Sequence, residues 1–189
     1  MKNTRSAAAK LSPVPEVSER PGTWHLARTE TERRLSDFEF CLERVVQAYY
    51  RWKAACLAAV CDVPLSGDDV SVLNVVRMGD EPKRLSEVGQ LLNRVDVPNL
   101  QYAVRKLTRA GLIETDGGSS RKETRYRVTK TGRTVTEAYA ELRAATLAPM
   151  LAELDGWADK SEATGLQLDL LSSLYGQAAQ IAITRRHKP

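Results

Sequence analysis

Residues 96–133 read DVPNLQYAVRKLTRAGLIETDGGSSRKETRYRVTKTGR, and this stretch decides the fold. Its first half has apolar residues at the i, i+3, i+4, i+7 spacing of a helix with one buried face: Leu100, Ala103, Val104 and Leu107. Asp96 stands where an N-cap is expected, Pro98 is tolerated in a first helical turn, and Gly111 is expected to end the helix. The pattern predicts an amphipathic helix between Asp96 and Gly111.

A β-hairpin is predicted directly after this helix. Segment LIETD, residues 112–116, alternates like a strand, and TRYRVT, residues 124–129, returns as the second strand. Gly117 and Gly118 supply the loop between them. Residues 119–133 hold six basic residues and a single acid. Because like charges this close repel one another, the arrangement favours a negatively charged partner outside the chain.

The charge of the chain is unevenly distributed. The formal net charge is +4, but residues 83–133 hold twelve Lys or Arg against five Asp or Glu, which is +7 and leaves −3 for the rest. A cationic segment between acidic flanks indicates a local site for a polyanion.

Composition excludes several classes of protein. The 189 residues are 42% hydrophobic and 28% charged, as in an ordinary soluble globular protein. No apolar run approaches the ~20 residues of a membrane span, and the N-terminus has no secretory pattern. Three cysteines, an odd number without framework spacing, do not form a disulfide scaffold. We therefore expect a cytoplasmic protein with no membrane partner.

Two short helices are predicted before the central stretch. Ser66 is expected to cap the first, with inner residues Val70, Leu73 and Val76. Ser86 is expected to cap the second, which begins near Leu85. Its inward-facing residues are expected to be Val88, Leu91 and Leu92. Three short helices followed by a basic hairpin form a winged helix-turn-helix. The expected fold class is thus mainly α with a small β-hairpin wing.

Longer helices are predicted on both sides of this unit. The first covers about residues 30–61 and is so broadly apolar that a partner chain is its simplest cover. After Lys130 helical spacing resumes, and Pro149 is expected to kink that helix. A last helix carries Leu166, Leu170, Leu171, Leu174, Ala178 and Ile181.

A winged helix-turn-helix places its third helix in the major groove of DNA, so candidate DNA-binding residues follow from the helical wheel and the hairpin. Gln can pair with adenine and Arg with guanine, whereas cations on the hairpin contact phosphates. Lys130 and Arg133 are expected to face phosphates, because cations at a helix N-terminus oppose its dipole. Tyr102 is interpreted either as a DNA contact or as an edge-of-core residue. The candidates are Arg84, Ser86, Pro98, Asn99, Gln101, Tyr102, Arg105, Arg109, Arg121, Lys122 and Arg125.

Three strings in this order resemble the MarR family of bacterial transcriptional regulators: RLSEVGQLL (84–92), VPNLQYAVRKLTRAGLIE (97–114) and RYRVTKTGR (125–133). The resemblance covers about residues 33–186. It implies a homodimer joined through the first and last two helices, a palindromic double-stranded DNA operator, and release by a small aromatic carboxylate. Segment WHLARTETERRL, residues 24–35, is similar to repressors of nicotinic-acid catabolism in that family, which implies a hydroxylated nicotinate.

The residue pattern, together with the resemblance, predicts a division of the chain. We expect a flexible N-terminal extension at 1–30, an N-terminal dimerisation helix at 31–62, a winged helix-turn-helix DNA-binding domain at 63–133 and C-terminal dimerisation helices at 134–189. The family's wing carries an Asp two residues before an Arg, whereas this chain has Ser120 and Lys122 there. Wing contacts are therefore expected to be looser.

Residues of the first helix and its approach are candidate ligand contacts: His25, Tyr49, Arg51 and Trp52. Tyr49 and Trp52 are alternatively interpreted as core or dimer packing. Arg51 and Lys53 are expected in solvent, as such cations usually are. Either side chain could pair with a ligand carboxylate if its charged end turned inward.

Two other functions remain open. Cys41 would serve a thiol-based redox-sensing regulator of the same fold, although a small apolar packing role is favoured. The alternative is a helical protein-interaction module without DNA binding. No catalytic, cofactor-binding or metal-ligating pattern is present in the sequence, so we expect no enzyme activity, no cofactor and no metal.

Overall fold

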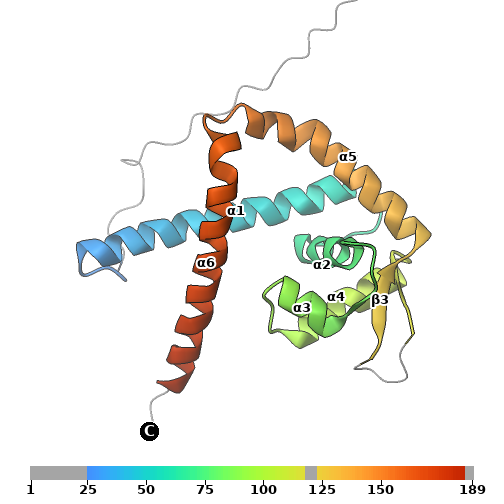
Figure 1. Cartoon of the computed structure of the whole chain (residues 1–189), viewed down its shortest axis with the longest axis horizontal. Helices are drawn as coiled ribbons and strands as arrows, with labels where there is room; N and C mark the ends of the chain where they lie inside the picture. Colours follow the sequence, from blue (N-terminus) through green and yellow to red (C-terminus); the bar gives the residue numbers. More distant parts are fainter. Residues whose placement is uncertain (1–24, 118–122, 186–189) are drawn as a thin grey trace, which may run out of the picture. The chain divides into compact units, whose positions relative to one another are not determined.

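The computed structural model describes residues 25–117 and 123–185 (Figure 1). These residues form a mainly helical fold with a small antiparallel sheet, which confirms the expected fold class. The predicted N-terminal extension falls mostly on residues 1–24, outside the described residues. The elements are α1 (Glu30–Ala58), α2 (Gly67–Arg77), β1 (Lys83–Arg84), α3 (Leu85–Leu91), α4 (Val97–Arg109), β2 (Ile113–Thr115), β3 (Arg125–Val128), α5 (Lys130–Ala152) and α6 (Trp157–Thr184).

Helix α1 crosses the boundary between two compact units, residues 1–46 and 47–189. In the first unit, the carboxylate of Glu32 accepts hydrogen bonds from the backbone N–H groups of Arg28 and Thr29, and so caps the start of the helix. Large apolar side chains of this unit stay exposed: Leu35, Phe38 and Val45.

The core of the second unit is built by α2, α3, α4 and β2 around the end of α1. The predicted inner face of α4 is confirmed, since its four residues are at most 3% exposed. Facing them are fully buried residues of the neighbouring elements: Leu57, Val70, Leu73, Val76, Val88, Leu112 and Ile113. This packing fixes α4 against α2 and leaves its opposite side free.

The cap of α2 is confirmed. The Ser66 hydroxyl accepts a hydrogen bond from the backbone N–H of Asp69, and the Asp69 carboxylate accepts one from the backbone N–H of Ser66. This reciprocal pair is a capping box, and it satisfies two backbone donors at the start of α2.

Two predictions for α3 are wrong. The N-cap is Arg84, whose backbone N–H donates to the Glu87 carboxylate at 2.6 Å, and Ser86 is an exposed residue inside the first turn. Leu91 is 52% exposed rather than buried. The helix has only seven residues, so its inward face holds Val88 and Gly89 and does not extend to Leu91.

The wing is a three-stranded sheet with strand order β1-β3-β2. The predicted hairpin is confirmed, with Ile113 opposite Val128 in antiparallel register. Strand β1 was not predicted, because its two residues are too few to show any alternation. It adds Arg84 opposite Arg125, so the wing is joined to the start of α3.

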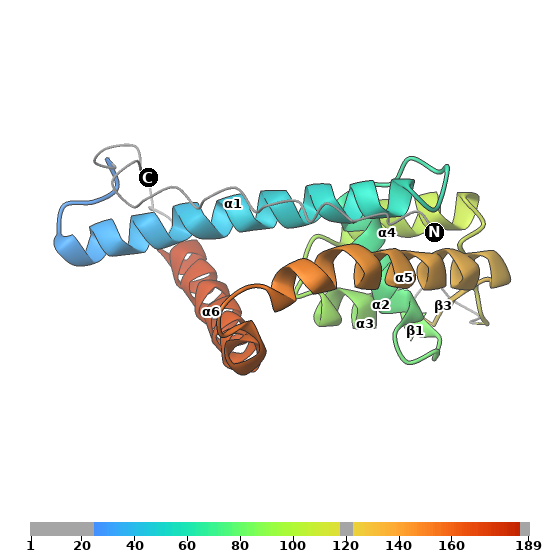
Figure 2. The ribbon, with the colours of Figure 1, turned by 90° about the horizontal axis from the view of Figure 1, so that it is seen from above.

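Helix α5 starts at the end of the wing, and Figure 2 shows its beginning beside β3. Thr129 caps it by accepting from the N–H of Gly132, and donates its own N–H to the carbonyl of Leu112 at 3.0 Å. Pro149 lies inside the helix, which continues to Ala152.

Helix α6 follows Gly156, which has a positive φ of 68°. None of its residues is buried. No described helix combines the length and the apolar character that a membrane crossing needs. The side chains of α6 that remain exposed include Leu166, Leu168, Leu170, Leu174, Ile181 and Ile183.

Candidate nucleic-acid interface

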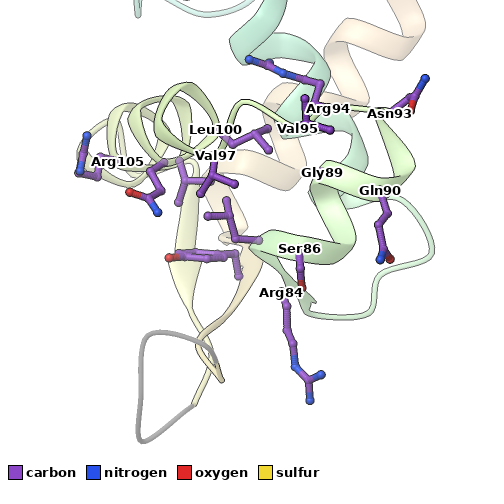
Figure 3. Close-up of a pocket in the computed structure, with 14 residues that line it drawn as sticks. Arg84, Ser86, Gly89, Gln90, Asn93, Arg94, Val95, Val97, Leu100 and Arg105 are labelled. Carbon is purple, nitrogen blue, oxygen red and sulfur yellow. The ribbon is translucent and has the colours of Figure 1, made fainter. Parts of the chain in front are cut away.

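A cavity of about 930 Å³ opens between α3, the first half of α4 and β3. Figure 3 shows Arg84 and Arg105 at its edges, with Val97 between them. Its lining residues are Arg84, Leu85, Ser86, Gly89, Gln90, Asn93, Arg94, Val95, Val97, Leu100, Gln101, Val104, Arg105 and Tyr126.

Two arginines that line this cavity, Arg84 and Arg105, are exposed, and so is Arg109 in the last turn of α4. None of them forms an ion pair with another described residue. Other cations nearby are neutralised within the protein, as Lys106 is by Asp69 at 2.7 Å. Guanidinium groups without an internal partner are available to phosphates or to guanine edges.

Several predicted DNA-binding residues lie on the same side. Ser86, Pro98, Asn99 and Tyr102 are exposed, and Gln101 is half-buried. Tyr102 is 60% exposed, so it is not an edge-of-core residue.

The wing cations divide into two groups. The guanidinium of Arg125 donates to the carbonyl of Pro82 at 3.0 Å and lies 4.0 Å from Glu87, so the protein holds this predicted contact in part. Arg133 lies 3.0 Å from Asp80, whereas Lys130 is exposed. The predicted contacts Arg121 and Lys122 lie outside the described residues.

The start of α4 is held by a pair of residues that sequence reasoning missed. Asp96 occupies the N-cap position, but its carboxylate makes no capping bond and binds the guanidinium of Arg94 instead, at 2.8 and 2.5 Å. Arg94 also lies 3.4 Å from Asp68 at the start of α2. The hydrogen bonds from Arg94 hold the pKa of Asp96 well below its ordinary value, and the one to Asp96 raises the pKa of Arg94. The Arg-Val-Asp order was the only sequence signal for this pair.

Comparison with known proteins fits this geometry. Residues 65–132 match the family model described as a winged helix DNA-binding domain. Sco5413, a MarR family transcriptional regulator from Streptomyces coelicolor, superposes with a TM-score of 0.59 over 74% of this chain and 96% of its own, at 18% identity. The fold is that of the MarR family of transcriptional regulators.

Two other similar structures were solved with DNA. Reduced AbfR bound to DNA has a TM-score of 0.62 at 16% identity, over 79% of this chain and 99% of its own; AbfR comes from Staphylococcus epidermidis. A variant of MarR from E. coli in complex with operator DNA has a TM-score of 0.59 at 16% identity, over 76% and 99%. No curated protein sequence matches the chain.

A second cavity of about 390 Å³ lies on the MarR-type fold between the end of α1, α2 and α5. Tyr49 and Trp52, both predicted ligand contacts, line it with stacked rings whose centroids are 6.3 Å apart. Tyr139 adds a third aromatic ring, whose centroid is 6.1 Å from that of Trp52. Burial raises the pKa of the Tyr139 hydroxyl to about 12. The side chain of Asn74 forms a hydrogen bond with this hydroxyl.

Other predicted ligand contacts do not join this cavity. Arg51 is exposed and does not line it, and His25 is an exposed residue of the first unit. Two cations line this cavity. Arg77 pairs with Asp80 and Glu137, whereas Arg143 pairs with no described acid. Arg143 lies one helical turn after Tyr139 on the same face of α5, and that i, i+4 spacing was the available signal.

Lys53 is not solvated, contrary to the prediction. It is 2% exposed, donates a hydrogen bond to Ser71, and lies 4.3 and 3.9 Å from the ring centres of Tyr49 and Tyr50. Burial lowers the pKa of Lys53, and the charge of Asp68 opposes that shift.

The cysteines form no disulfide. Cys56 is buried, and burial raises the pKa of its thiol, whereas Cys41 and Cys61 are half-buried. Within residues 25–117 and 123–185, no three His, Cys, Asp or Glu side chains come together as a metal site would need.

Proposed function

We propose that the protein is a sequence-specific DNA-binding transcriptional regulator, acting as a homodimeric repressor on a palindromic operator. The observation that carries this proposal is that Arg84 and Arg105 line the cavity between α4 and the wing, and that neither has an acidic partner among the described residues. Isolated guanidinium groups repel one another, so an external polyanion stabilises the arrangement.

The geometry of α4 supports insertion into a major groove. Its inner face is fully buried, while Pro98, Tyr102 and Arg105 are exposed on the other side. A helix fits the groove, and arginine pairs with guanine through two hydrogen bonds. In a dimer, the two α4 helices enter successive major grooves when they are about 34 Å apart.

Helix α6 supports a homodimer. Leu166, Leu170 and Ile183 are between 60% and 66% exposed. Monomeric soluble proteins seldom expose an apolar strip of this kind, and a second copy of the chain would cover it.

The second cavity supports control by a small aromatic carboxylate. Tyr49, Trp52 and Tyr139 offer faces for a ring, while Arg143 offers a positive charge to a carboxylate. The cavity borders α2, which packs on α4. An acid that binds more tightly to one α4 spacing than to the other shifts the balance by that difference in affinity. We propose a hydroxylated nicotinate as this ligand, because it is a small aromatic carboxylate.

Selection from a randomised duplex library tests the proposal directly. We expect a palindromic consensus whose half-sites are centred about 10 base pairs apart, with affinity falling steeply as salt rises. A panel of aromatic acids that includes benzoate and 6-hydroxynicotinate is then added to the complex to measure release. Enrichment of no sequence, or binding without salt dependence, contradicts the proposed function.

A further inference from the structure

The first turn of α4 presents apolar side chains to solvent. Val97, its first residue, is 48% exposed, Val95 just before it is 94% exposed, and Pro98 is exposed. Valine is a poor helix former and gains nothing from exposure. Helix stability therefore does not explain the valine at position 97.

These valines lie within the proposed DNA-binding face. Val95 and Val97 both line the cavity whose edges carry Arg84 and Arg105 (Figure 3). An apolar surface bordered by unpaired guanidinium groups fits a ligand with apolar groups between negative charges. The major groove of DNA has that character where thymine methyl groups lie between phosphates.

Polar groups near Val97 are already engaged. The side-chain amide of Asn99 donates to Asp96 at 3.1 Å, and the Asp96 carboxylate is bound by Arg94. The residues nearest the base edges at the start of a recognition helix are thus better suited to apolar contact than to hydrogen bonding.

We propose that Val97, with Val95 beside it, recognises thymine through its C5-methyl group, so that each operator half-site has thymine under the first turn of α4. This inference rests on the proposed DNA-binding function. It assigns part of the sequence preference to two residues without polar side-chain atoms, and leaves guanine recognition to Arg105.

The test compares thymine with deoxyuridine, which lacks only that methyl group. Each thymine of the selected operator is replaced in turn, and the full-length protein is titrated by fluorescence anisotropy. We expect one or two replacements in each half-site, at positions related by the symmetry of the operator, to weaken binding. Each should weaken it about fourfold, the effect of burying one methyl group. Val97→Ala should weaken binding to the thymine operator by a similar factor and lose its response to deoxyuridine.

Leu26→Ala is the matched control, because Leu26 is 59% exposed and precedes α1, outside both the DNA-binding domain and the dimerisation helices. Its ratio of affinities for thymine and deoxyuridine operators should equal that of the unmodified protein. Tight binding with no effect of deoxyuridine overturns the inference alone, as does a Val97→Ala protein that keeps the full response. Absence of binding to every duplex overturns the proposed function and this inference with it.

Discussion

The guanidinium of Arg94 donates two parallel hydrogen bonds, of 2.8 and 2.5 Å, to the carboxylate of Asp96. A second side of the same guanidinium lies 3.4 Å from Asp68. Because Asp96 precedes α4 and Asp68 lies in the first turn of α2, one arginine joins the starts of the two helices. Arg94 therefore ties the start of α4 to the start of α2.

Arg94→Met should lower specific DNA affinity about tenfold while the helical content stays unchanged, because α4 keeps its core but loses its fixed start. The free energy of unfolding should fall by about 1–2 kcal/mol, since the acids are 49% and 39% exposed and solvent screens the pair. Anisotropy and urea denaturation measure the two effects. Arg51→Met, which removes an exposed arginine of α1, is the control for lost charge. Equal losses in both variants would show that Arg94 acts only through its charge.

The same pair predicts a response to acid. The pKa of Asp96 is held below its ordinary value of 3.8, so the contribution of the pair is fully present above about pH 4. It should be lost as pH falls through the lower folded value. Urea denaturation from pH 6 to pH 2 should show the difference in unfolding free energy between the unmodified protein and Arg94→Met shrinking at the acid end. A constant difference over this range argues against the ion pair.

Arg105→Ala should cost about 1–3 kcal/mol of binding free energy and relax the preference at one base pair, because a bidentate contact to guanine would be lost. Arg109→Ala, in the last turn of α4, should instead weaken binding to all sequences and reduce the salt slope by about one phosphate contact. Titration of the operator and its point variants at four salt concentrations separates the two effects. Uniform weakening by Arg105→Ala would mean that this residue does not read bases.

Elements with a full helical period could be predicted from the sequence, and single contacts could not. Helix α4 shows four buried residues at regular spacing, and all four are in the core. Helix α3 has seven residues, too few for periodicity to distinguish Leu91, which is exposed, from Val88, which is buried.

The errors on charged residues have a different origin. Lys53 was expected in solvent, because lysine usually is, but two tyrosine rings and Ser71 make a site for its ammonium group. Only tertiary packing brings these groups together. For the same reason, sequence predicted the cap position of Asp96 but not its arginine partner.

Gly132 is required by packing rather than by its backbone angles. A Cβ there would collide with the carbonyl oxygen of Leu112, a backbone atom that also accepts the N–H of Thr129. Gly132→Ala should therefore lower the free energy of unfolding by about 2–4 kcal/mol. Gly165→Ala is the matched control, because a Cβ on this α6 glycine meets no other group within 4 Å. It should raise stability by about 0.5–1 kcal/mol, since alanine favours the helix. Similar urea midpoints for the two variants would show that the collision is relieved without cost.

Arg143→Met should weaken release by an aromatic acid about tenfold and leave operator affinity unchanged, because the residue faces the second cavity and not α4. Arg51→Met is the matched control, since Arg51 is exposed and does not line the cavity. Titration of the preformed DNA complex with 6-hydroxynicotinate and benzoate gives the half-release concentrations. A stronger effect at Arg51 would move the ligand site away from this cavity.

Buried Lys53 predicts a change of stability at alkaline pH. Burial between α1 and α2 lowers its pKa below the ordinary value of 10.5, and Asp68 only partly restores it. Between the folded and unfolded values the unfolded chain binds more protons, so stability rises with pH in that window, by at most about 1.4 kcal/mol per pH unit. The destabilisation that comes from burying the charged Lys53 is complete below its pKa in the folded protein and disappears towards pH 10.5.

The free energy of unfolding of the unmodified protein should therefore increase relative to Lys53→Met as pH rises from 7 to 10. Lys160→Met, at an exposed position, subtracts the general effect of one lost positive charge. A relative stability that falls over this range would mean that the rings of Tyr49 and Tyr50, with Ser71, favour the charged ammonium more than burial opposes it.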